Sequence, residues 1–411
     1  MNRSARRVAL LLIAGIMTGC GSQEEPAVHA FEVVMEEGVA TAVTSGGPLY
    51  EEPLFTYEEV LRLQQDEERP ESLLSRPSYF VMDEGGWFYV TDWGQSRIAC
   101  FGPTGRYSHD IGREGEGPGE FRFPSVEAVE KGVVTVFDRR LFRASRFKTD
   151  GTFIDSVPLT RSRMTIQRFR FGPGDERMLL GDYQRGSMNE YRHNTAAAVI
   201  LSADGDTLAS VLSDSVRVSF QIFLPDIRVG GMAPIYFSGR PGVDYHPDHG
   251  LVMTTGRDPV IGYYGLDGRL QRRIRLDAQP ESVATEEREA IMEDLRGAVE
   301  EARDDSRRRM AEARIEHAEF QDPKGFWSGV RVDDRGYLWA AGPNPFAPES
   351  SPVLKVFSPE GEYLGEAAYP ARRSQHMHGH VLSVIEDEET GAQELVVFRM
   401  RPAVEGFHYP E

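Results

Sequence analysis

An all-β fold built from repeated units is predicted by three features of this 411-residue sequence. Short runs of β-branched and aromatic residues recur along the chain, separated by Asp-Gly-type turns, as in antiparallel hairpins. The runs indicate antiparallel strands without intervening helices, which together with the repeat period favours a β-propeller over a β-sandwich. Turn glycines also recur, and their early intervals are close to the roughly 40–50 residues of a four-stranded blade. These glycines are Gly105, Gly151, Gly205, Gly268 and Gly361. We therefore expect a six-bladed β-propeller with a helical insertion between the fourth and fifth blades.

The first twenty residues differ in character from the rest of the chain. Arg3, Arg6 and Arg7 precede an apolar run at 8–16, which is about the length of the hydrophobic region of a secretory signal and too short to span a bilayer. Small residues lead directly to Cys20, and the whole segment resembles a bacterial lipoprotein signal. Cys20 would then be the acylated first residue of the mature chain. The alternative is an ordinary signal peptide with a chance cysteine.

The residue after the cysteine indicates in which membrane a lipoprotein of this kind resides. By resemblance to Gram-negative lipoproteins, an Asp at this position would favour inner-membrane retention, and this chain has Gly21. We expect a signal peptide at 1–19, a tether at 20–30 and the propeller at 31–411. The lipid, such as palmitate, would sit in the outer membrane, with the propeller facing the periplasm or the cell surface. A net charge of −19 disfavours nucleic acid as a partner.

The segment before the repeats combines several patterns. Residues 31–34 and 39–43 are expected to form short strands, whereas 55–65 has helix-like apolar spacing with Thr56 as its N-cap. We expect one early strand to pair with the last strands of the chain, because closed repeat folds avoid free edges in this way.

The repeats begin at Val81, and each contributes a group of short strands around its turn. The expected strands are 87–91, 97–101 and one from 106; 133–137, 144–147 and 152–154; 178–180, 197–201 and 206–208; 251–254, 260–264 and 269–270; 337–340, 354–357 and 362–364; and 381–385 and 395–398.

A helical insertion explains the long interval before the fifth repeat. Residues 286–319 are rich in Glu, Arg and Ala, with Ile291, Leu295 and Val299 at i, i+4 spacing and Thr285 as N-cap. The insertion is expected to occupy about 281–320. It could cover the central opening of the propeller or decorate one face, and the sequence leaves both open.

The first repeat resembles the NHL repeat. Its matching positions in the sequence are Asp92, Gln95, Arg97 and Phe101, and Asp138, Arg143 and Phe147 recur at equal offsets. The glycine-rich stretch 111–121 is similar to a segment of bacterial six-bladed propeller lipoproteins, a family mostly without assigned function. Residues 112–119 do not suit a phosphate loop, because their glutamates would repel phosphate. We interpret them as a tight inter-blade crossing in which glycine supplies positive φ.

Two groups of side chains are candidates for chemistry. Asp92, Asp138 and Asp182 follow the same strand of successive repeats, so they could form a metal-binding ring or cap their own turns. On a strand, His376, His378 and His380 would share a face and could converge on a metal. A loop leading into the last blade is the alternative for these histidines, and the sequence identifies no cofactor.

The function expected from the sequence is binding. We expect an outer-membrane lipoprotein that acts as a binding or scaffold module for a protein of the envelope or a small ligand. The alternative is a metal-dependent hydrolase or lyase, lactonase-like, with its site in the central channel, as the resemblance to NHL-type propellers implies. No nucleophile elbow, zinc-protease motif or phosphate-loop motif is present.

Overall fold

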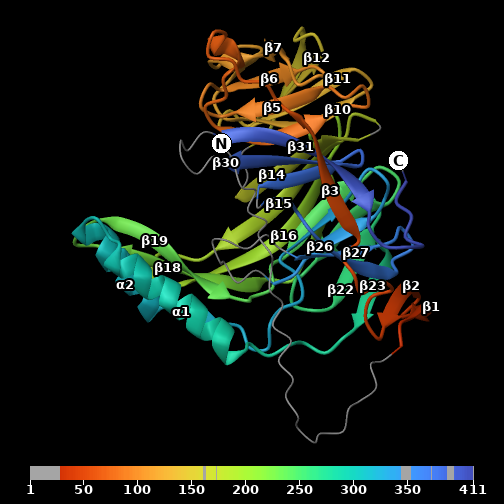
Figure 1. Ribbon diagram of the computed structural model, residues 1–411, viewed down its shortest axis with the longest axis vertical. Coiled ribbons are helices and arrows are strands. Elements are labelled where there is room, and N and C mark those ends of the chain that lie inside the picture. The colour runs from red at the N-terminus through yellow and green to blue at the C-terminus, as the bar shows by residue number, and fades with distance from the viewer. Residues whose placement is uncertain are drawn as a thin grey trace, which may run out of the picture.

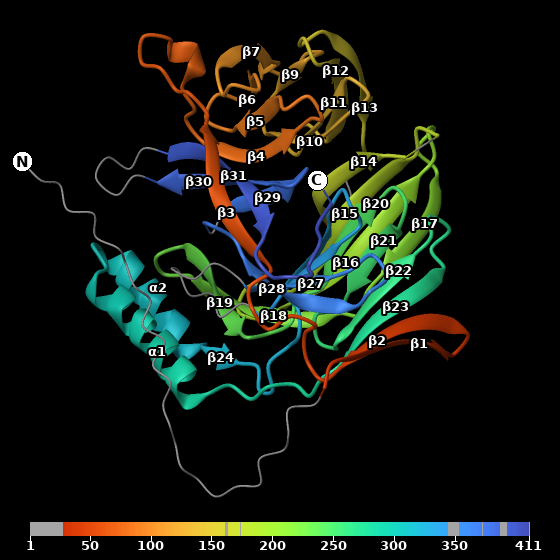
Figure 2. The same cartoon turned by 45° about the vertical axis from the view of Figure 1, so that its right-hand side comes forward.

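The structure, a computed structural model, describes residues 28–160, 163–172, 174–343, 353–371, 373–386 and 393–410. It is the six-bladed β-propeller expected from the repeats (Figures 1 and 2), with four antiparallel strands in each blade. The expectations for Cys20 and the rest of 1–27 lie outside the described residues. Within the described ranges, no helix is long and apolar enough to cross a membrane.

The blades follow one another along the chain, and each begins with its innermost strand. Blade 1 is β4 (Pro77–Met82), β5 (Phe88–Asp92), β6 (Arg97–Phe101) and β7 (Tyr107–Ile111); blade 2 is β10 (Pro124–Glu130), β11 (Val133–Asp138), β12 (Arg143–Lys148) and β13 (Phe153–Pro158); blade 3 is β14 (Met164–Phe171), β15 (Arg177–Arg185), β16 (Tyr191–Leu201) and β17 (Thr207–Leu212). The short strands β8 (Arg113–Glu114) and β9 (Glu120–Phe121) pair in the glycine-rich crossing between blades 1 and 2.

The second half of the ring repeats this order. Blade 4 is β20 (Gly242–His246), β21 (Gly250–Thr254), β22 (Val260–Tyr264) and β23 (Leu270–Asp277); blade 5 is β25 (Gly329–Val332), β26 (Leu338–Ala341), β27 (Val353–Phe357) and β28 (Tyr363–Ala368); blade 6 is β29 (Ser374–Met377), β30 (His380–Glu386), β31 (Gln393–Pro402) and β3 (Phe55–Arg62). The expected strands match the second to fourth strands of the blades, but the innermost strands were not predicted.

The closing strand of the ring comes from the N-terminal part of the chain. β3 pairs antiparallel with β31, with Phe55 opposite Pro402. The prediction of a helix at 55–65 is therefore wrong, although an early strand does pair with the last strands as expected. The other early strands, β1 (Ala30–Glu36) and β2 (Val39–Ser45), form a hairpin that extends blade 4 through a parallel pairing of β2 with β23.

Six hydrophobic clusters hold the blades together, one between each pair of neighbours. Phe137 of blade 2, for example, packs in one cluster with Phe169 of blade 3. The sixth cluster joins blade 6 back to blade 1, with Leu382 and Val397 on one side and Phe80 on the other. Among the described residues, each blade therefore packs a buried cluster against the neighbour on either side.

Two insertions pack against each other beside the ring (Figures 1 and 2). The hairpin of β18 (Val216–Leu224) and β19 (Val229–Tyr236) extends the sheet of blade 3, because β18 pairs with β16. Helices α1 (Thr285–Glu300) and α2 (Asp305–Glu316) follow blade 4, and β24 (Glu319–Phe320) pairs with β19. Met310 of α2 is buried against Ile222 of β18. The insertion thus contains two helices, and α1 begins after Ala284, whose N–H donates to Glu287.

Candidate functional site

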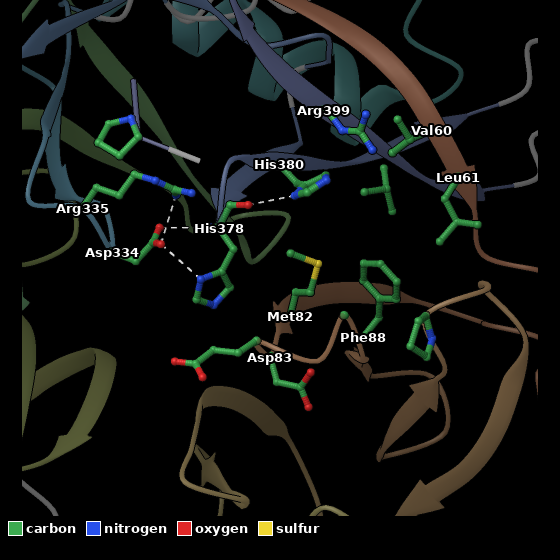
Figure 3. Close-up of a pocket in the computed structure, with 15 residues that line it drawn as sticks. Val60, Leu61, Met82, Asp83, Phe88, Asp334, Arg335, His378, His380 and Arg399 are labelled. Atoms are coloured by element: carbon green, nitrogen blue, oxygen red, sulfur yellow. Dashed lines mark hydrogen bonds and ion pairs between the residues drawn. The ribbon is translucent and has the colours of Figure 1, made fainter. Parts of the chain in front are cut away.

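A pocket of about 640 Å³ lies where the innermost strands β4, β25 and β29 end (Figure 3). Blades 1, 5 and 6, the closing strand β3 and the C-terminal segment all contribute to its wall. Its apolar lining is Val60, Leu61, Met82, Phe88, Pro103, Val397 and Pro410. Its ionisable lining is Asp83, Glu84, Asp334, Arg335, His378, His380 and Arg399. The volume is in the range of pockets that hold small molecules.

A tight turn places the histidines of the pocket. His378 and Gly379 have φ values of 48° and 68°, and Met377 pairs with His380, which makes a two-residue hairpin between β29 and β30. Two positive φ values in succession are typical of the type I′ turn, which matches the twist of paired strands. Histidine tolerates this left-handed conformation better than a β-branched residue does. The turn therefore projects His378 from the hairpin tip into the pocket.

His378 forms an ion pair with Asp334, from the turn after β25. Asp334 accepts hydrogen bonds from the backbone N–H of His378 (3.0 Å) and from its Nδ1 (3.1 Å), and Arg335 donates to the same carboxylate (3.1 Å). Burial opposes the charge of Asp334, but the bonds from His378 outweigh it, so the pKa of Asp334 lies below its usual range. The hydrogen bond to Asp334 in turn raises the pKa of His378. Both groups therefore favour their charged forms.

His380 differs from its neighbour in charge. Its Nδ1 lies 2.8 Å from the carbonyl oxygen of His378, and it pairs across the sheet with Arg399. Burial lowers the pKa of His380, so the neutral imidazole is favoured. The pocket thus presents one histidine that favours its cationic form and one that favours its neutral form.

The third histidine of the sequence cluster lies elsewhere. His376 is buried against Trp339, with ring centroids 4.4 Å apart, and its Nδ1 contacts the hydroxyl of Tyr369. Burial lowers the pKa of His376 to about 3. The three imidazoles do not converge, because the hairpin turn interrupts the alternation that a continuous strand would give. No group of three or more His, Cys, Asp or Glu side chains that could hold a metal was found among the described residues.

Asp92 and Asp138 each cap a turn of their own blade. Asp92 accepts hydrogen bonds from the N–H groups of Gly94 (3.1 Å), in its own turn, and of Ser75 (3.1 Å) and Arg76 (2.8 Å), in the loop that enters the blade. Asp138 accepts four bonds in the same arrangement. They come from Arg122 (2.7 Å), Phe123 (3.2 Å), Arg140 (2.9 Å) and Leu141 (2.8 Å). This geometry fits the turn-capping alternative rather than a metal-binding ring.

Asp182 occupies the equivalent position in blade 3 but is held differently. It accepts one bond from Gln167 Nε2 (2.7 Å), and its Oδ2 has no hydrogen-bond partner among the described residues. An arginine follows both Asp92 and Asp138 by five residues, and the structure shows which groups each arginine contacts. Arg97 lies 3.7 Å from Asp92 and donates to Asp110 (2.7 Å) and to the carbonyls of Glu71 (2.8 Å) and Leu73 (2.7 Å). Arg143 donates to the carbonyls of Glu116 (2.9 Å) and Gly117 (2.6 Å).

The sequence reasoning did not identify most of the residues that line the pocket. Glu84 and Asp334 are the second residues of the turns that follow β4 and β25, which are equivalent positions in blades 1 and 5. Alignment of the two turns could have indicated that they lie at the same end of the propeller. Their approach to His378, however, depends on closure of the ring.

Comparison with known proteins agrees with the fold. A family model described as a 6-bladed beta-propeller matches residues 68–157, which include the strands of blades 1 and 2. A search of curated proteins finds no match.

Solved structures with similar architecture share little sequence with this chain. A protein described as exported, from Bacteroides fragilis NCTC 9343, has 9% identity and a TM-score of 0.50, covering 88% of this chain and 99% of its own. A member of the DUF4221 family from Bacteroides vulgatus ATCC 8482 has 11% identity and a TM-score of 0.46, covering 86% and 100%. A catalytically inactive virginiamycin B lyase from Staphylococcus aureus has 10% identity and a TM-score of 0.40, covering 84% and 99%. At these identities the likeness concerns the fold alone.

Proposed function

We propose that this chain is a ligand-binding β-propeller lipoprotein of the bacterial outer membrane, with NHL-like blades, and that the pocket between blades 1, 5 and 6 is its recognition site. The observation that supports this proposal is the separation of charge across the pocket. Asp83 and Glu84 come from blade 1 and Arg399 comes from blade 6, whereas Arg335 of blade 5 is paired with its neighbour Asp334. Figure 3 shows Asp83 across the pocket from Arg399.

Such a pocket suits a ligand that carries both charges. An ammonium group would face Glu84, whose side chain is exposed, and a carboxylate would face Arg399, which is also exposed. The apolar residues between them, among them Met82 and Phe88, would contact the ligand's body. An amino acid or a short peptide has this chemistry, so we propose a zwitterion of this class as the ligand.

Three forms of one dipeptide test the charge pairing. Calorimetric titration is expected to show that alanyl-leucine binds, and that N-acetylation or C-terminal amidation each weakens binding. Because the charged groups are exposed, each loss should be about two- to fivefold. Glu84→Gln should remove the effect of acetylation, and Arg399→Gln should remove the effect of amidation.

Matched surface variants serve as controls for these titrations. Glu289→Gln on α1 and Arg257→Gln in the loop after β21 are exposed and lie outside the pocket, so they should bind as the unmodified chain does. The proposed ligand class would be wrong if the three dipeptide forms bound equally or not at all.

The lipid anchor is a separate part of the proposal. Cys20→Ser is expected to abolish incorporation of labelled palmitate and to move the protein from the membrane fraction to the soluble fraction, because the acylated cysteine would be lost. A variant that stayed in the outer-membrane fraction, as judged by density-gradient separation, would contradict anchoring through Cys20.

The hydrolase or lyase alternative requires a metal in the central channel. The described residues offer no set of three donors for it. No observation on these residues therefore favours that alternative over binding.

A further inference from the structure

A cluster of charged side chains surrounds the propeller axis, separate from the pocket. The innermost strands of neighbouring blades contact one another there, and Figure 2 shows β4, β10, β14, β20 and β29 around the centre of the ring. The axial cluster consists of Glu127, Arg168, Arg170, Asp244, Arg331 and His376, one or two from each of five innermost strands. None of these residues lines the pocket.

The two acids of the axial cluster are already occupied. Asp244 accepts hydrogen bonds from Arg168 Nη1 (2.9 Å) and from the N–H of Val332 (3.0 Å), one on each oxygen. Glu127 accepts from Ser125 (2.6 Å) and from Arg170 Nη1 (3.3 Å). Each carboxylate therefore already has an arginine partner within the axial cluster.

The arginines of the axial cluster are more accessible than the acids. Side-chain exposure is 20% for Arg168 and 21% for Arg170, compared with 3% for Asp244 and 4% for Glu127. A molecule that reaches the axial cluster therefore contacts guanidinium groups first. The accessible part of the cluster favours an anion.

Arg331 is the member of the axial cluster that lacks a direct acidic partner among the described residues. Its side chain is half-buried, and no hydrogen bond or ion pair joins it to another described residue. Burial and the nearby charge of Arg168 lower the pKa of Arg331 to about 10, so it stays charged at neutral pH. His376 is neutral there, and burial raises the pKa of Tyr369. A desolvated charge without a partner is costly to retain.

We propose that the axial cluster binds a small oxyanion, a carboxylate or a phosphate, between the guanidinium groups of Arg331 and Arg168. The planar fork of arginine matches both groups and can donate two parallel hydrogen bonds to either. The bound anion would supply the partner that Arg331 lacks among the described residues. This site goes beyond the proposed peptide pocket and does not depend on it.

Anion titration of the full chain tests the proposal. Sodium phosphate and sodium acetate are titrated separately at constant ionic strength, balanced with sodium chloride, while the unfolding temperature and the heat of binding are followed. At least one of the two anions is expected to raise the unfolding temperature saturably, and the comparison shows whether phosphate or carboxylate is preferred. Failure of both anions to act beyond chloride would overturn the proposal.

Three variants locate the site. Arg331→Gln is expected to weaken anion binding at least tenfold, and Arg331→Lys should weaken it less because the charge remains. Arg269→Gln, at a side chain that is 87% exposed on blade 4, should leave binding unchanged. Unchanged anion binding by Arg331→Gln would also overturn the proposal.

The unfolding temperature without added phosphate or acetate shows whether Arg331 has a structural role instead of a binding role. Because Arg331→Gln removes a desolvated charge that has no direct partner among the described residues, its unfolding temperature in chloride should equal or exceed that of the unmodified chain. A lower unfolding temperature would show that Arg331 supports the fold, which would contradict the proposal. Arg399→Gln, which alters the peptide pocket, should leave anion binding by the axial cluster unchanged. Loss of peptide binding with intact anion binding would therefore show that the two sites fail independently.

Discussion

Replacement of Asp138 by alanine is expected to destabilise the propeller by about 4 kcal/mol, measured as the free energy of unfolding in urea. The carboxylate of Asp138 is fully buried and accepts four backbone hydrogen bonds. Alanine leaves these four N–H groups without their acceptor, and burial prevents water from replacing it easily. Asparagine should also destabilise strongly, because its amide nitrogen would face two N–H donors.

Asp182 provides the matched control for Asp138. It holds the same register in blade 3 and is almost as buried, but among the described residues it accepts only the bond from Gln167, a side chain. Asp182→Ala is therefore expected to cost no more than about 1 kcal/mol. Equal losses for Asp138→Ala and Asp182→Ala would show that turn capping is not what makes Asp138 important.

Phe55→Ala is expected to cost about 3–5 kcal/mol, because it leaves a cavity where β3 closes the ring. The Phe55 ring stacks on Trp339 at 5.4 Å between centroids and meets Phe407 at 5.3 Å and Tyr409 at 5.1 Å. These partners come from blade 5 and the C-terminal segment. Urea unfolding measures the loss, and limited proteolysis should show earlier cleavage at β3.

Glu58→Gln is the control on the same strand. The Glu58 side chain is 53% exposed and pairs with Arg401 at the surface (2.8 Å), so neither stability nor proteolysis should change measurably. If Phe55→Ala behaved like Glu58→Gln, the packing of β3 could not be what holds the ring closed.

The sequence predicted the outer strands of the blades far better than the innermost ones. Second and third strands read as apolar runs, because both of their faces are buried between blades; β5 and β6 are buried throughout. Innermost strands carry charged residues toward the axis, such as Arg168 and Arg331, and these residues break the apolar pattern. The axial cluster therefore lies on the strands that the sequence reasoning missed.

The error at β3 has a different physical cause. β3 is the outermost strand of its blade, so polar residues such as Thr56, Glu58 and Arg62 occupy much of it and weaken the strand pattern. Its pairing partner, β31, is near the other end of the chain. Local periodicity contains no information about that partner, and a helix was the better local interpretation.

The position of β3 also determines when the ring can close. Synthesis proceeds from the N-terminus, so β3 is made before any blade and β31 is made after five of them. The two strands cannot meet until the chain is nearly complete, and joining segments so distant in sequence carries the entropy cost of a very long loop. Until then, β31 has an unpaired edge and Trp339 lacks its stacking partner Phe55. Ring closure is therefore a late step in folding, and the open ring is the state most prone to pair with another chain.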